Sequence, residues 1–188
     1  MQSALSVYMG SEAAKTIGEQ GWQAAPFSTL IGASGGPKWL ILSELDKVLG
    51  QALLLKRGEP MTLLGSSIGT WRHACLSIND PGAAISRLQH AYLYQEYSCA
   101  RPSPIEVSEV AEQMLREALG PEGARQISNH ATLHNAIVTA RAKGVARGES
   151  GWKLGMGMAT ATLGNAISRK GLGLLFDRVA FCHGELNA

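Results

Sequence analysis

Short apolar runs and longer stretches of helical period alternate along the first half of this chain. The runs at 27–32 and 61–65 have the length and apolar content of buried strands. Each is followed by a stretch, at 39–49 and 68–78, in which apolar residues recur every three or four positions. Because strands that alternate with helices build α/β sheets, this order predicts a fold of the α/β class.

Two of the predicted helices carry a clear apolar face. In the stretch 39–49 the leucines recur at helical spacing, so we expect them to point toward the core. Another helix is predicted at 83–97, after the turn signal Asn-Asp-Pro-Gly at 79–82. The residues expected to be buried are Leu42, Leu45 and Leu49 on the first helix and Ile85, Leu88, Tyr92 and Leu93 on the second.

Local signals mark the ends of two more helices. A serine cap and Gly21 bound a short predicted helix at 11–20. Ser103, followed by proline and then by Glu106, predicts a capping box, in which the serine hydroxyl accepts a hydrogen bond from the amide three residues later. We expect this helix to end near Gly120.

Two glycine-serine turns carry the candidate chemistry. The sequence Gly-Ser-Ser-Ile-Gly at 65–69 fits the pattern G-x-S-x-G, in which a tight strand-to-helix turn lifts a serine hydroxyl above the sheet. The sequence Gly-Ala-Ser-Gly-Gly at 32–36 fits the same pattern, so the pattern alone does not choose between Ser34 and Ser67. The context favours Ser67 as the nucleophile, since the first turn has features of an anion-binding site.

These features are Gly35 and Gly36, which lead into Pro37, a favourable first helical residue, and Lys38. Small residues at a helix start expose backbone N–H groups at the positive end of the helix. An acyl-transfer enzyme needs such donors for its oxyanion, and losing one costs about 3 kcal/mol of barrier. The N–H groups of Gly35, Gly36 and Ile68 are therefore the candidate oxyanion hole. Lys38 is either part of that site or a solvated helix residue.

In order and spacing the two turns resemble those of the patatin-like phospholipases. In that family a strand leads into a Gly-Gly-x-Arg/Lys oxyanion turn, and after a helix the next strand ends in G-x-S-x-G. Gly35, Gly36 and Lys38 match the first motif and 65–69 the second, while Ser34 stands where the family has a glycine. The resemblance covers roughly residues 27 to 80. It implies a three-layer α/β/α hydrolase with a central sheet and helices on both faces.

The family's base is an aspartate in Asp-Gly-Gly or Asp-Gly-Ala, which forms a Ser-Asp dyad. None of the chain's three aspartates, Asp46, Asp80 and Asp177, has those neighbours. We therefore expect residues 1–188 to be the N-terminal portion of a longer single hydrolase domain, incomplete at its C-terminus, with the dyad aspartate outside it. The alternative is a complete domain that uses a different base.

The second half of the chain contains two predicted strands and one ambiguous segment. The stretches 132–142 and 178–182 have strand character, because β-branched and apolar residues are frequent in them. The segment 151–169 is rich in glycine, which lowers helix propensity. It is compatible with a loop that contains one helical turn or with a mobile flap over a lipid site.

Histidines offer other candidates for a base or a ligand. His73 follows Ser67 by six residues on the same predicted helix, so contact with the Ser67 hydroxyl is not expected. His130 and His134 are four residues apart, a spacing that binds zinc on one helix face, but no acidic third ligand is near them. His183 lies six residues after Asp177, which is too close for the usual Asp and His of a triad.

Charge and composition exclude some classes of function. The 188 residues are 45% hydrophobic and 17% charged, which is typical of a globular domain. The net charge is only +2, and no basic stripe interleaved with aromatic residues indicates nucleic-acid binding. The last quarter is basic. Its residues Arg141, Lys143, Arg147 and Lys153 are either a solvated surface or a peripheral contact with an anionic membrane.

The three cysteines lack C-x-x-C spacing and the N-terminus has no signal-peptide pattern, so a cytoplasmic location is expected. The resemblance implies a serine lipid acyl hydrolase, a phospholipase or esterase, that acts on acyl lipids through an acyl-enzyme and needs no cofactor or metal. Two alternatives remain open. One is an acyl-carrier transacylase, which requires a partner histidine, and the other is a catalytically incomplete patatin-like lipid-binding protein.

Overall fold

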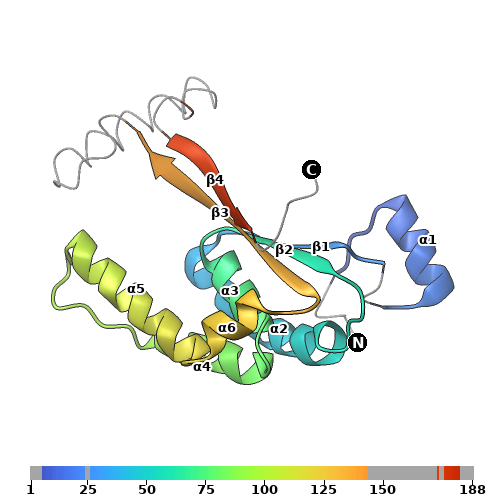
Figure 1. Cartoon of the computed structure of the whole chain (residues 1–188), viewed down its shortest axis with the longest axis horizontal. Coiled ribbons are helices and arrows are strands. Elements are labelled where there is room, and N and C mark those ends of the chain that lie inside the picture. The colour runs from blue at the N-terminus through green and yellow to red at the C-terminus, as the bar shows by residue number, and fades with distance from the viewer. Residues whose placement is uncertain (1–5, 24–25, 144–172, 174–175, 183–188) are drawn as a thin grey trace.

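The computed structural model describes residues 6–23, 26–143, 173 and 176–182. Within these ranges the chain forms four strands and several helices, as Figure 1 shows. The ambiguous segment 151–169 and His183 lie outside the described residues, so the expectations for them stay predictions.

A four-stranded sheet organises the fold. Its strands are β1 (Thr29–Gly32), β2 (Met61–Gly65), β3 (Leu133–Ala142) and β4 (Phe176–Cys182), and they lie side by side in chain order. The first three are parallel, whereas β4 pairs antiparallel with β3. The predicted strands are therefore confirmed within a few residues, and the fold is of the α/β class.

Helices fill the connections between the strands. A helical segment without a break joins β1 to β2, beginning as a 3-10 helix and ending as a π-helix, and three α-helices plus a short fourth join β2 to β3. The elements are α1 (Ser11–Gln20), η1 (Gly36–Leu42), α2 (Ser43–Leu49), η2 (Gly50–Leu54), α3 (Ile68–Leu76), α4 (Pro81–Leu93), α5 (Pro104–Leu119) and α6 (Gly123–Ser128).

The helices that connect the strands form one layer on the sheet. Connections between parallel strands are almost always right-handed, so two successive connections in a sheet ordered β1-β2-β3 run over the same face. Figure 1 shows α2 to α6 on one side of the sheet, with α1 standing apart. On the other face the side chain of Ile31 is 71% exposed. Helices were expected on both faces of the sheet, but the described part of the chain has a single helical layer.

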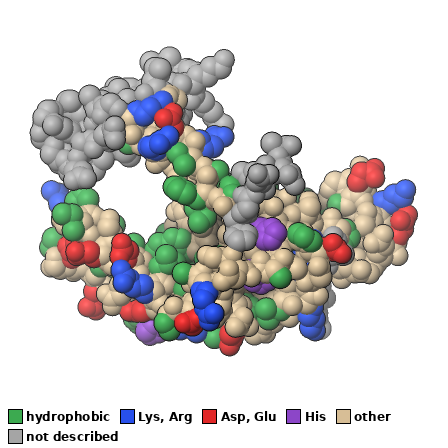
Figure 2. Space-filling model, in the orientation of Figure 1, with side chains coloured by type: hydrophobic (Ala, Val, Ile, Leu, Met, Phe, Trp, Pro, Cys, Tyr) green, Lys and Arg blue, Asp and Glu red, His purple; other side chains and the backbone are tan. Residues whose placement is uncertain are grey.

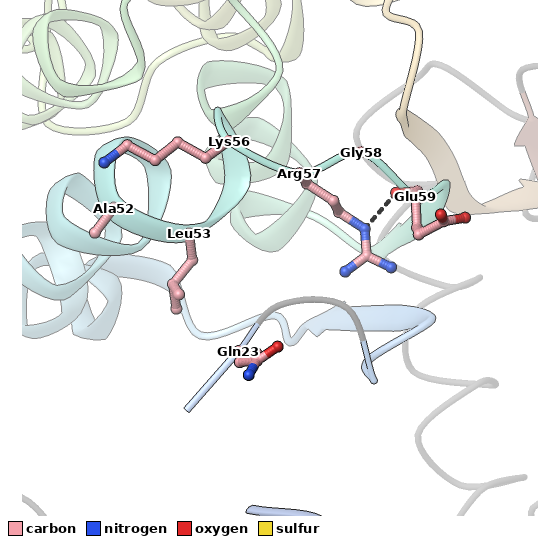
Figure 3. A pocket seen from close by; sticks show the side chains of 7 residues that line it. All are labelled: Gln23, Ala52, Leu53, Lys56, Arg57, Gly58 and Glu59. Carbon is pink, nitrogen blue, oxygen red and sulfur yellow. Dashed lines mark hydrogen bonds between the residues drawn. The ribbon is translucent and has the colours of Figure 1, made fainter. Parts of the chain in front are cut away.

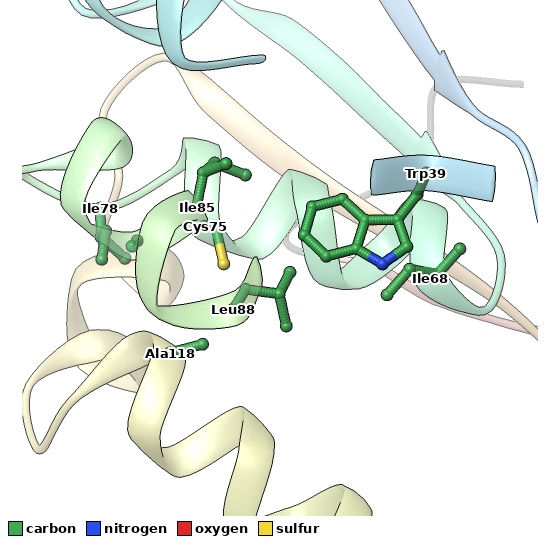
Figure 4. Packing of buried hydrophobic residues seen from close by; sticks show 8 residues of the cluster. Trp39, Ile68, Cys75, Ile78, Ile85, Leu88 and Ala118 are labelled. Carbon is green, nitrogen blue, oxygen red and sulfur yellow. The ribbon is translucent and has the colours of Figure 1, made fainter. Parts of the chain in front are cut away.

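The core lies where both connections meet beneath the sheet. Trp39 of η1 packs with Ile68 and Cys75 of α3, and with Ile85 and Leu88 of α4. Figure 4 shows the Trp39 ring beside Ile68 and the other members gathered between α3, α4 and α5. A second buried cluster joins the sheet to α3 and η2 and consists of Leu54, Met61, Leu63, Leu76 and Leu133.

The predicted inner face of the 39–49 helix is wrong at two of its three leucines, whereas Leu49 is half-buried. Leu42 and Leu45 are exposed, whereas Ser43 and Asp46 are buried. The reason is an ion pair between Asp46 and Arg72 of α3, which turns the polar side of α2 inward. The prediction for α4 is confirmed at Ile85 and Leu88, but Leu93 is the last residue of a helix shorter than expected and is 55% exposed.

Helix ends follow the local signals in part. The Ser103 hydroxyl accepts a hydrogen bond from the Glu106 amide at 3.1 Å, which confirms half of the capping box. The Glu106 carboxylate instead accepts hydrogen bonds from Ser98. Gly21 ends α1 at a φ of 73°, as expected, but the cap position at its start is Gly10, which has no side chain to cap the helix.

Replacing Ser103 with alanine should lower the free energy of unfolding by about 1 kcal/mol, because the Glu106 amide loses its acceptor. The matched control is Ser108→Ala in the same helix. The Ser108 hydroxyl only donates back to the Pro104 carbonyl, and its loss should change stability by less than about 0.5 kcal/mol. Urea denaturation of both variants measures the difference, and equal losses would show that Ser103 is not a functioning cap.

Candidate functional site

The two glycine-serine turns lie side by side at one edge of the sheet. Gly32 and Gly65, the last residues of β1 and β2, are partners in the parallel register. The turns that follow are joined by hydrogen bonds from the Ser66 amide to the Gly32 carbonyl (3.2 Å) and from the Ser34 hydroxyl to the Ser66 carbonyl (3.3 Å). The carboxyl edge of a parallel sheet is where α/β proteins bind their ligands.

Ser67 occupies a strained position in the second turn. Its φ is 52° and its ψ is −133°, and outside glycine it is the only residue in the described ranges with a positive φ. Such a conformation is rare for a residue with a side chain and is maintained only where the surrounding structure enforces it. The Ser67 side chain is exposed at the start of α3. This is the geometry that G-x-S-x-G elbows give to a nucleophile.

The glycines on both sides of Ser67 are required by close packing. A Cβ atom on Gly65 would lie 2.8 Å from the backbone of Thr70. A Cβ atom on Gly69 would collide with the carbonyl of Gly32. The first turn of α3 therefore packs directly onto the ends of β1 and β2, which is possible only without side chains at these positions.

The first turn starts a helix beside open space. Gly36 has a φ of 51° and begins η1, and no atom lies within 4 Å of the position that its Cβ would take. Amides in the first turn of a helix have no intrahelical acceptor, which applies to Gly36 in η1 and to Ile68 in α3. The Ile68 side chain packs with Trp39, so one buried contact holds the two helix starts together. Lys38 is exposed two residues further along.

His73 lies beneath the turns and not beside the Ser67 hydroxyl. Its side chain is 2% exposed, and a Cβ atom on Gly32 would meet the imidazole ring at 2.7 Å. Burial, together with the positive charge of Arg72, lowers the pKa of His73 to about 4. The ring is therefore neutral at pH 7 and is part of the packing between α3 and β1.

Each aspartate of the chain already has a structural partner. Asp46 pairs with Arg72, and Asp80 caps α4 by accepting a hydrogen bond from the Ala83 amide at 2.9 Å. Asp177 of β4 pairs with Lys143 at 2.7 Å, and the hydrogen bond from Lys143 lowers the pKa of this carboxyl. In the described residues the turn of the candidate nucleophile thus lies beside the candidate oxyanion turn, but every aspartate is engaged in another contact.

The histidine pair does not lie on one helix. His130 is in the turn before β3, where its Nδ1 accepts hydrogen bonds from the amides of Thr132 (3.2 Å) and Leu133 (3.0 Å), and His134 belongs to β3. The four-residue spacing of these two histidines therefore does not place them on one helix face. In the described part of the chain, no group of three His, Cys, Asp or Glu side chains is arranged to hold a metal ion.

The strands β3 and β4 extend beyond the edge that carries the turns. Ile137 is level with Gly65, and β3 continues to Ala142. Charged side chains gather at the tip of this extension, as Figure 2 shows. Arg141 is exposed there, while Lys143 is bound to Asp177 and to the Gly173 carbonyl. Arg147 and Lys153 lie outside the described residues.

A pocket of about 240 Å³ lies at the opposite, amino edge of the sheet and is drawn in Figure 3. Arg57 is its buried cation, with its Nε donating to the Glu59 carbonyl (2.5 Å) and its Nη2 to the Pro60 carbonyl (3.0 Å). The guanidinium thus stabilises the loop that leads into β2. The residues that line the pocket are Gln23, Ala52, Leu53, Lys56, Arg57, Gly58 and Glu59.

Comparisons of the chain with protein-family models, with curated proteins and with solved structures found no match. The site is therefore interpreted from its own geometry. No helix among the described residues is both long enough and apolar enough to cross a membrane.

The neutral His73 predicts a loss of stability in acid. The unfolded chain has a histidine pKa near 6.5 and binds the proton first as pH falls, because the folded pKa is about 4. The free energy of unfolding should therefore decrease below pH 6.5, by about 2 kcal/mol between pH 7 and pH 5. Urea denaturation at both pH values should show this extra loss in the wild type but not in His73→Gln. An equal loss in both proteins would show that groups other than His73 cause the acid sensitivity.

Proposed function

We propose that this chain carries the nucleophile and oxyanion hole of a patatin-like serine hydrolase that cleaves acyl esters through an acyl-enzyme. The observation that supports this most is the strained, exposed Ser67, held between glycines that cannot carry side chains. A second glycine turn lies beside it and begins a helix, whose first amides have no intrahelical acceptor. A packing turn does not need an exposed serine in a strained conformation, whereas an acyl-transfer site does.

In the proposed reaction the Ser67 Oγ attacks the ester carbonyl while its proton passes to a base. The N–H groups of Gly35, Gly36 and Ile68 donate hydrogen bonds to the oxyanion that forms. When the carbonyl reforms, the bond to the alcohol breaks and the alcohol takes the proton from the base. Water then attacks the acyl-enzyme while the base accepts its proton. As the carbonyl reforms, the bond to the Ser67 Oγ breaks, the base returns the proton to Oγ, and the acid leaves.

The base follows from the resemblance and is an aspartate of a Ser-Asp dyad. Asp46, Asp80 and Asp177 each have other partners, so we place the dyad aspartate outside residues 1–188. The proposed substrate is an acyl lipid, the proposed location is the cytoplasm, and the second helical layer of the three-layer fold belongs to the same proposal. Lys38 is exposed near the turn and is available to an anionic head group.

One observation favours a second function. The structural engagement of all three aspartates is equally expected of a patatin-like domain that binds lipid without cleaving it. The two functions differ in the reactivity of Ser67, because an inactive domain keeps the turn but leaves the serine hydroxyl unactivated.

The test of the nucleophile is labelling with a fluorophosphonate, using the protein expressed at its full natural length. We expect one label, mapped to the peptide that contains Ser67, and its loss in Ser67→Ala. The matched control Ser34→Ala should keep the label, since Ser34 only donates a hydrogen bond to Ser66. Label that persists on the Ser34 peptide in Ser67→Ala would reverse the assignment. A protein that never reacts would support the lipid-binding function.

A second test concerns the oxyanion turn and uses Gly36→Ala with Gly120→Ala as its control. Both glycines have a positive φ, 51° and 69°, and both have open space where a Cβ would be placed, so each variant carries backbone strain without a steric clash. We expect each to lose about 1–3 kcal/mol of stability. Only Gly36→Ala should slow labelling of Ser67, by about 100-fold, because it displaces an oxyanion donor. Equal labelling rates would make Gly36 a structural turn.

A further inference from the structure

A buried ion pair joins the two helices that start at the site. The Arg72 guanidinium donates to the Asp46 carboxylate through two hydrogen bonds, Nε to Oδ2 and Nη2 to Oδ1, each 2.6 Å long. The Asp46 side chain is 1% exposed and the Arg72 side chain 13% exposed. Such a two-point pairing fixes both the distance and the relative rotation of the two groups.

Each partner is rigidly connected to one half of the site. Asp46 belongs to α2, which continues η1 without a break from Gly36. Arg72 belongs to α3, which begins immediately after Ser67. The pair therefore sets how the helix that starts at the oxyanion turn lies against the helix that starts at the nucleophile.

Stability alone does not explain this pair. Burying two charges costs solvation, and apolar residues of similar size in place of a buried ion pair are often as stable or more stable. With the polar side of this helical segment facing inward, apolar side chains of η1 and α2 face solvent. Ile41 of η1 and Val48 of α2 are 85% and 61% exposed. The structure thus has a directional contact at a position where apolar packing would be at least as stable.

We infer that Asp46 and Arg72 are positioning residues that hold the N–H groups of Gly35 and Gly36 at the distance from Ser67 that the oxyanion requires. This role rests on the function proposed above. Neither side chain touches the reacting atoms. Donors act only within about 2.7–3.1 Å of the oxyanion, and a displacement of about 1 Å costs up to about 100-fold in rate.

The test compares a charged and an apolar pair in the protein at its full natural length. The double variant Asp46→Leu, Arg72→Leu removes both charges together, so no unpaired charge stays buried. We expect it to fold with a melting temperature equal to or above that of the wild type. On a soluble p-nitrophenyl ester its kcat should fall by about 100-fold while KM changes less than about threefold.

The matched control is Ser77→Ala at the end of α3. It removes a buried hydrogen bond with Asn135, far along the helix from Ser67, and should lower the melting temperature without changing kcat of the folded enzyme. A double leucine variant that is folded and keeps wild-type kcat would overturn the positioning role. If that variant does not fold, kcat of the variant Arg72→Lys provides the test. It keeps the charge but loses the two-point contact, and a folded Arg72→Lys enzyme with unchanged kcat would also overturn the role.

The same experiment separates the two proposals. Turnover in the wild type that disappears in Ser67→Ala establishes the serine hydrolase, and unchanged kcat in the pair variants then refutes only the positioning role. If the wild type shows no turnover dependent on Ser67, the proposed hydrolase fails and the positioning role fails with it.

Discussion

The site depends on a close approach between the start of α3 and the ends of β1 and β2. Gly69 lies so near the Gly32 carbonyl, and Gly65 so near Thr70, that neither position has room for a side chain. This contact leaves Ser67 a positive φ and an exposed side chain, because the chain must turn from strand to helix within two residues. It also places His73 under Gly32, where burial keeps the imidazole neutral.

The topology of the sheet brings the two turns together. The strands β1 and β2 are parallel, adjacent and in register at their last residues, so the segments that follow them begin at the same edge. Right-handed connections then place η1 and α3 on the same face, where Trp39 and Ile68 pack together. Within this layer the Asp46–Arg72 pair adds a directional contact to the apolar packing of Trp39 with Ile68. Apolar packing by itself permits small sliding movements.

Much of the local structure was predictable because its signals come from neighbouring residues. The capping serine at 103, the glycine that ends α1 and the apolar runs of β1 and β2 act over a few positions. Long-range contacts produced the errors. Leu42 of η1 and Leu45 of α2 were expected inside because helical spacing does not reveal that Asp46 pairs with Arg72, 26 residues later, and takes the inner face.

The sequence by itself determined that strand, turn and helix follow one another twice, and that small residues and serines occupy both turns, since these depend on propensity and backbone sterics. Only the tertiary structure decided which serine is strained, which face of α2 is buried and which aspartates are engaged elsewhere. Ser34 and Ser67 share one pattern, and they differ because only Ser67 is followed by a helix packed directly onto the neighbouring strand end. That difference is a contact between distant segments, which no local pattern contains.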